Sequence, residues 1–95
     1  MIKLTKIRPS KKVGKKYDAI FNIDGKQKIV SFGARSYSDF IHHKDEARKQ
    51  RYITRHQANE DWNNPVTPGS LSRWILWNKP TLHESVTDFM KRFNL

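Results

Sequence analysis

Apolar and polar residues alternate most clearly between residues 17 and 32. The runs 17–23 and 26–32 are rich in aromatic and β-branched residues, and Asp24-Gly25 separates them. An Asp-Gly pair between two such runs is typical of a two-residue type I′ turn, in which both residues take positive φ. The sequence therefore predicts a β-hairpin with residue 23 opposite 26, 21 opposite 28, 19 opposite 30 and 17 opposite 32.

One face of this hairpin is apolar near its open end, and we expect that end to pack on the core. The residues of this apolar end are Tyr17, Ala19, Val30 and Phe32. Toward the turn the same face carries Phe21 between Lys26 and Lys28, which predicts an exposed aromatic ring flanked by two lysines. Residues 2–8 can supply a third strand, and residues 9–16 would then form a solvated basic loop.

After about residue 38 the apolar spacing becomes that of helices. Residues 44–57 are predicted to form one helix, because acidic residues stand in its first turn and basic residues in its last. Its apolar side is thin and consists mainly of Tyr52 and Ile53. Residues 59–66 read as an irregular connection, with Trp62 expected to anchor it in the core.

Two further helices are predicted after this connection. Thr67-Pro68 opens the first as N-cap and first helical residue, and the segment 78–80 should end it. We expect Leu71, Trp74 and Ile75 on its buried side. Thr81 and Glu84 form a capping box for the last helix. The apolar face of that helix carries Leu82, Val86, Phe89, Met90 and Phe93.

These elements predict the fold class α+β: a short antiparallel sheet of about three strands followed by three helices. With 95 residues the chain has room for a single domain and one core. We divide it into a basic strand region, residues 1–35, and a helical region, residues 36–95. The absence of cysteine excludes disulfides, zinc–thiolate sites and thiol catalysis. No apolar run is long enough for a membrane span or a signal peptide, so we expect neither membrane insertion nor secretion.

The charge of the chain and its distribution bear most directly on function. The chain carries 19 lysines and arginines against 9 aspartates and glutamates, a formal net charge of +10. Residues 1–35 hold a net +8 and residues 36–95 only +2, and solubility alone needs no such segregation. We therefore expect a polyanionic partner, with duplex DNA favoured among nucleic acids.

Two groups of basic residues are the candidate binding site, together with two lysines near the hairpin turn. The first group lies in the predicted loop. The second forms a stripe along one face of the predicted helix 44–57, and no acidic residue interrupts it. The candidates are Lys11, Lys12, Lys15, Lys16, Lys26, Lys28, Lys44, Arg48, Arg51 and Arg55. The alternative is that the stripe is an ordinary solvated helix face, with Asp45 and Lys49 paired one turn apart.

Chemistry other than binding has little support in the sequence. His43 and His56 would stand about 20 Å apart on one helix and could not share a metal ion. Carboxylates such as Asp39 and Glu46 have no recognised nuclease spacing. We therefore predict no enzymatic activity, no metal and no cofactor. Gly69 could leave amides free for a phosphate at a helix start, and one of Trp74 and Trp77 could stack on a base, but structural roles are favoured for all three.

The chain also resembles a family of small basic proteins of large eukaryotic DNA viruses, of the marseillevirus and mimivirus kind. The resemblance covers about residues 16–95 and leaves out the first strand and the basic loop. It rests on the segments 31–33, 37–39, 43–45, Arg51-Tyr52, Arg55-His56, Trp62 and above all the run 69–82. The resemblance implies no catalytic residue. It implies a viral setting: the virion, and in the host cell a cytoplasmic virus factory or the nucleus.

Two functions therefore stand as hypotheses. The first is a non-enzymatic protein that binds nucleic acid or another polyanion without sequence specificity. The second is a structural or adaptor protein that docks on an acidic surface of a viral or host protein. Oligomeric state is left open by the sequence.

Overall fold

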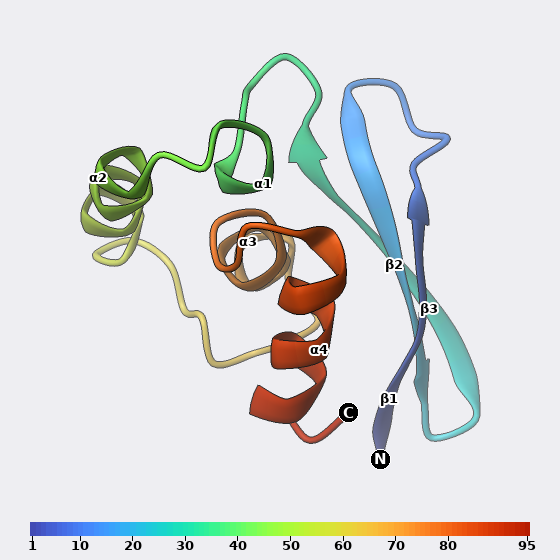
Figure 1. Ribbon diagram of the computed structural model, residues 1–95. Coiled ribbons are helices and arrows are strands. Elements are labelled where there is room, and N and C mark those ends of the chain that lie inside the picture. The colour runs from blue at the N-terminus through green and yellow to red at the C-terminus, as the bar shows by residue number, and fades with distance from the viewer.

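A three-stranded antiparallel sheet with all its helices on one face forms the protein, in a computed structural model that describes residues 1–95 (Figure 1). Its elements are β1 (Ile2–Pro9), β2 (Lys15–Ile23), β3 (Lys26–Ala34), α1 (Phe40–His43), α2 (Glu46–His56), α3 (Pro68–Leu71), η1 (Ser72–Leu76) and α4 (Leu82–Arg92). The strand order β1-β2-β3 follows the chain. The predicted α+β class is confirmed, with one short helix, α1, that the sequence did not predict. None of the helices has the length and apolar character that a bilayer crossing requires.

The predicted hairpin is confirmed in register. Ile23 pairs with Lys26, Phe21 with Lys28, Ala19 with Val30 and Tyr17 with Phe32. At the turn Asp24 has φ 52° and Gly25 has φ 88°, as a type I′ turn requires. The side-chain oxygen of Asn22 accepts the Gly25 backbone N–H at 2.9 Å, which fixes the turn locally.

The first strand is longer than predicted, and the basic loop is correspondingly shorter. β1 continues to Pro9 and β2 begins at Lys15, so the loop spans residues 10–14 instead of 9–16. Lys15 and Lys16 therefore belong to a strand. A polar cluster closes this end of the sheet. The buried carboxylate of Asp18 accepts hydrogen bonds from Ser10 at 2.6 Å and Ser31 at 2.7 Å, and these bonds lower its pKa.

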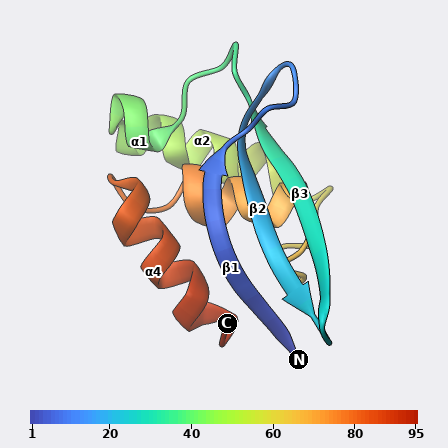
Figure 2. The same ribbon diagram turned by 90° about the vertical axis from the view of Figure 1, so that its right-hand side faces the viewer.

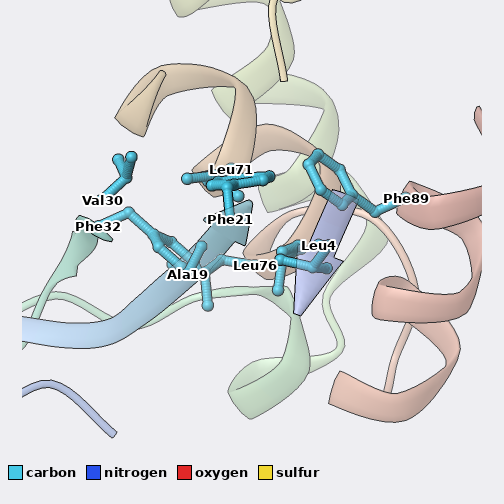
Figure 3. Packing of buried hydrophobic residues seen from close by; sticks show 9 residues of the cluster. Leu4, Ala19, Phe21, Val30, Phe32, Leu71, Leu76 and Phe89 are labelled. Carbon is cyan, nitrogen blue, oxygen red and sulfur yellow. The ribbon is translucent and has the colours of Figure 1, made fainter. Parts of the chain in front are cut away.

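The core lies between the sheet and the helices α3, η1 and α4. Its buried members are Leu4, Ala19, Phe21, Val30, Phe32, Leu71, Ile75, Leu76 and Phe89. Figure 3 shows the strand side chains gathered against Leu71, Leu76 and Phe89. The prediction of an exposed Phe21 was wrong: the ring is fully buried. β1 extends the sheet beside it and brings Leu4 opposite Phe21, so the apolar face is deeper than the hairpin alone suggested.

The last helix has the predicted form. Thr81 is its N-cap, and the hydroxyl accepts the Glu84 backbone N–H at 3.2 Å. Phe89 is fully buried, and the other four predicted face residues pack against the core as partly buried side chains. Figure 2 shows α4 running alongside β1. Amphipathic periodicity was therefore sufficient to place this helix.

The helices between the sheet and α4 differ from the prediction in three places. Lys44 does not belong to α2: it is the C-cap of α1 with φ 54°, and Asp45 is the N-cap of α2. The helix opened by Thr67 and Pro68 ends at Leu76, two residues before the predicted stop, because its last part widens into the π-helical segment η1. Trp62 lies outside the core cluster; its ring packs edge-on against Trp74 at 6.5 Å.

Candidate functional site

A cleft of about 540 Å³ lies at the open end of the hairpin. One wall is the end of β2 and β3, the other is α2, and α3 with η1 forms the base. In Figure 1 this end is at the top, opposite the β2–β3 turn and both chain termini. The cleft exists because α2 meets the rest of the molecule through few apolar residues and does not close onto the sheet.

Basic side chains from distant parts of the sequence meet across this cleft. Lys15 and Lys16 reach it from β2, and Arg48 and Arg55 reach it from α2. Glu60 is the single acidic residue in the lining. None of the chain's ion pairs involves Lys15, Arg48 or Arg55. The cleft therefore carries unneutralised positive charge on two facing walls.

Lys16 has a different role from its neighbours, because its charge is already paired. Its ammonium group forms an ion pair with Asp39, and the exposed fractions of the two side chains are 17% and 9%. Asp39 is also the N-cap of α1, where the carboxylate accepts the His42 backbone N–H at 3.0 Å. This pair joins β2 to the start of α1.

Stacked aromatic rings support the α2 wall. The rings of Tyr52 and Trp77 are parallel within 3° at a centroid distance of 4.3 Å. The His56 ring also stacks on Tyr52, at a centroid distance of 4.3 Å. His43 packs against Trp77 at 5.3 Å. Burial raises the pKa of Tyr52 and lowers that of His43, so burial favours the neutral form of both groups.

The base of the cleft is the π-helical turn. The Trp77 backbone N–H reaches the Ser72 carbonyl at 3.0 Å, and this wide turn places Ser72, Leu76 and Trp77 in the lining. π-helical turns are rare and are frequently found at functional sites. Gly33 of β3 passes directly over this turn with φ 80°, and a Cβ there would lie 2.7 Å from Leu76 Cδ1. Only glycine fits this close approach without a shift.

The remaining lining residues divide into a neutralised corner and an open rim. In the corner, Glu60 lies 3.5 Å from His56 and accepts the indole N–H of Trp62 at 3.0 Å. The same carboxylate stands beside Gly69, at the start of α3, where the sequence suggested free amides for a phosphate. At the rim, Tyr37 is 74% exposed and has no aromatic neighbour within the protein.

The structure brings together four of the ten residues that the sequence singled out: Lys15, Lys16, Arg48 and Arg55 line the cleft. Lys11 and Lys12 are exposed on the adjoining loop, and Arg51 is exposed on α2 next to the lining residues. Lys44 is exposed between α1 and α2, with its ammonium group donating to the Ile41 carbonyl at 2.6 Å.

Lys26 and Lys28 lie at the other end of the sheet. They follow the hairpin turn, whereas the cleft adjoins the Lys15–Ala34 pair eight residues along β2. At about 3.3 Å per residue, Lys26 lies about 26 Å from that pair, and Lys28, opposite Phe21, lies about 20 Å from it. The two lysines therefore cannot contribute to the cleft.

Sequence reasoning missed Tyr37 at the rim of the cleft and the stacked aromatic rings that support the α2 wall. Tyr37 stands in a polar connecting segment with no periodicity, and an isolated aromatic residue in such a segment was the only signal in the sequence. The Asp45–Lys49 pair, which the alternative interpretation of the stripe required, is absent: Lys49 lies 3.5 Å from Glu46 instead. No group of three or more histidine, aspartate or glutamate side chains is arranged to hold a metal ion.

The chain belongs to a family of unknown function, DUF5754, whose sequence model matches residues 5–56. No curated protein and no solved structure matches the chain. The matched range includes the basic loop, which lies outside the resemblance to viral proteins over residues 16–95. It ends before the run 69–82, on which that resemblance mainly rests. Both charged walls of the cleft lie inside the matched range.

Proposed function

We propose that this member of the DUF5754 family is a non-enzymatic nucleic-acid-binding protein that holds phosphate groups of DNA at its cleft end. The observation that carries the proposal is the meeting of two basic groups far apart in sequence. Lys15 on β2 faces Arg48 and Arg55 on α2, and Glu60 is the only carboxylate between them. Such a concentration of unpaired cations raises the local concentration of polyanions and speeds their association.

Recognition of this kind should be independent of base sequence. Twelve of the nineteen basic residues are lysine, which acts as a point charge and lacks the rigid fork that reads guanine. The exposed Lys11 and Lys12 on the adjoining loop extend the charged surface beyond the cleft. Contacts to phosphate position a protein on DNA but carry no sequence information.

The biological setting is part of the proposal. The resemblance to proteins of large DNA viruses supports a viral protein that acts in the virion, in a cytoplasmic virus factory or in the host nucleus. A protein with a net charge of +10 suits a compartment crowded with a genome.

A second candidate is an adaptor that docks on an acidic protein surface. The observation in its favour is Val13, which is 96% exposed in the basic loop beside Lys11 and Lys12. A protein partner could cover this apolar side chain, whereas DNA phosphates offer nothing that would cover it.

Salt dependence of binding to a fluorescent DNA duplex tests the proposal. If about six phosphates are neutralised, log affinity should fall with log salt at a slope of about −5, a loss of about a thousandfold between about 50 and 200 mM. Replacing Lys11, Lys12 and Lys15 with alanine should flatten this slope by up to about 3 on every sequence. Lys16 is left in place because it joins β2 to Asp39.

Two results would overturn the proposal in favour of the adaptor. The first is the absence of DNA and RNA binding at about 50 mM salt, where phosphate contacts are strongest. The second is binding whose affinity does not change with salt, because neutralised phosphates always release counterions.

A further inference from the structure

We infer that the cleft receives one unpaired nucleotide, with its phosphate between Lys15 and the arginines of α2 and its base against the ring of Tyr37. The inference rests on the proposed function and specifies the ligand of that site. It makes single-stranded DNA, or the frayed end of a strand, a better ligand than an intact duplex.

The size of the cleft is the first argument. Its volume of about 540 Å³ falls within the range of about 300–1,000 Å³ that is typical of small-molecule sites. A duplex, whose major groove alone is about 12 Å wide, must remain outside a cleft of this size. Only one unit of a flexible strand can enter and leave the rest of the strand on the surrounding basic surface.

The lining offers a contact for both parts of a nucleotide, the phosphate and the base. Arg48 and Arg55 have exposed guanidinium groups without a carboxylate partner, and such groups bind phosphate oxygens with paired N–H bonds. Tyr37 lines the same cleft with 74% of its surface exposed and no ring stacked on it. A free aromatic face next to a basic groove is the arrangement by which proteins bind single strands without sequence preference.

The aromatic side chains on the α2 wall are fixed by stacking. Tyr52 is clamped between Trp77 and His56, so the α2 wall offers a rigid edge and leaves Tyr37 as the face available to a base. A duplex keeps its bases stacked inside and could not use Tyr37, whereas an unpaired base is available for stacking at no cost of unpairing. A run of aspartate and glutamate residues could use the cations but has no flat ring to cover Tyr37.

The experiment compares a fluorescent dT oligomer of about 12 nucleotides with a duplex of equal length at about 100 mM salt. The parent protein should bind the oligomer at least about tenfold more tightly than the duplex. Tyr37→Leu should weaken oligomer binding by about tenfold, the equivalent of one lost base stack, and leave duplex binding unchanged. Tyr37→Phe is the matched control and should bind as the parent does, because it retains the ring. Thymidine monophosphate should displace the oligomer at lower concentration than inorganic phosphate.

Each other outcome has a definite meaning. Duplex binding as tight as oligomer binding, with no effect of Tyr37→Leu, would overturn this inference and leave the proposed function standing. Inorganic phosphate that competes as well as the nucleotide would overturn the stacking role of Tyr37. Failure to bind either DNA, or displacement of DNA by polyglutamate as readily as by dT, would overturn the proposed function and this inference together.

Discussion

The helices α4 and α2 are equally long but are attached to the molecule in different ways. α4 places Phe89 in the centre of the core, and its other apolar face residues pack around the same cluster. No residue of α2 belongs to that cluster or packs against it. α2 is held by one buried residue, Tyr52, whose ring rests on Trp77, and by the Lys49 ammonium group, which donates to the Asn78 carbonyl at 3.0 Å.

The difference explains where a binding site can form. An apolar helix face is driven onto the sheet until no space is left, as α4 shows. A helix with one apolar anchor covers less of its neighbour, and the space between α2 and the sheet is the cleft. The face of α2 that borders this space carries Arg48 and Arg55.

Removal of the α4 anchor should have the largest effect. Phe89→Ala should lower the free energy of unfolding by about 3–5 kcal/mol, which for a domain of this size approaches its whole stability. Phe89→Leu keeps most of the volume and should cost about 1 kcal/mol if the alanine variant does not fold. Urea unfolding measures both, with the exposed His83→Ala on the same helix as control. A loss below about 1 kcal/mol in Phe89→Ala would show that α4 is not attached through its apolar face.

The corresponding change in α2 should be smaller and more local. Tyr52→Ala should cost about 2–3 kcal/mol, less than Phe89→Ala because the ring borders the cleft and water can enter the space. Tyr52→Phe should stay within about 0.5 kcal/mol of the parent, since the ring keeps its stacking. Hydrogen exchange should show faster exchange in α2 of Tyr52→Ala and unchanged exchange in α4. Equal acceleration in both helices would mean that the two attachments are not separate.

The ion pair at the junction of β2 and α1 should contribute next. Asp39→Ala removes a helix cap and leaves the half-buried Lys16 unpaired, for an expected loss of about 2 kcal/mol. Asp45→Ala removes the cap of α2 without breaking any ion pair and should cost about 1 kcal/mol. Thermal unfolding compares the two. Equal losses would show that the pair with Lys16 adds nothing to the cap.

The smallest effect concerns the pH dependence of the link between α1 and α2, where His43 is the last residue of α1. Burial, reinforced by the nearby Arg48 charge, lowers the pKa of His43 below its usual 6.5. Asp45 and Asp39 oppose this shift through their charges. The neutral ring also accepts the Asp45 backbone N–H at 2.9 Å through Nδ1, and protonation would break that bond.

The sign follows from proton uptake by the unfolded chain. Below about pH 6.5 the unfolded chain binds a proton at His43 that the folded protein does not bind, so stability decreases as the pH falls through this range. Urea unfolding at about pH 7.5 and 5.5 measures the difference. His43→Leu should reduce it, and the exposed His83→Asn should leave it unchanged. A parent protein equally stable at both pH values would contradict the lowered pKa of His43.

The same contrast accounts for what the sequence could predict. The hairpin register and the apolar face of α4 follow from short-range periodicity and turn chemistry, and both were correct. The burial of Phe21 depends on β1 pairing beside it, and the position of Lys44 depends on a helix of four residues too short to carry a period. The cleft could not be predicted, because it depends on long-range packing that brings Lys15 and Arg48 together. The sequence on either side of each residue carries no sign of that packing.

In the proposed function, the position of the basic residues, and not net charge alone, makes the cleft the binding site. The direct test compares two triple glutamine variants that remove the same charge: Lys15, Arg48 and Arg55 at the cleft, or Lys3, Lys26 and Lys28 near the hairpin turn. DNA binding by fluorescence anisotropy is measured against salt for both variants. We predict that the cleft variant flattens the slope of log affinity against log salt by about 3, and the turn variant by less than about 1. Equal flattening in the two variants would contradict the claim and reduce the interaction to net charge.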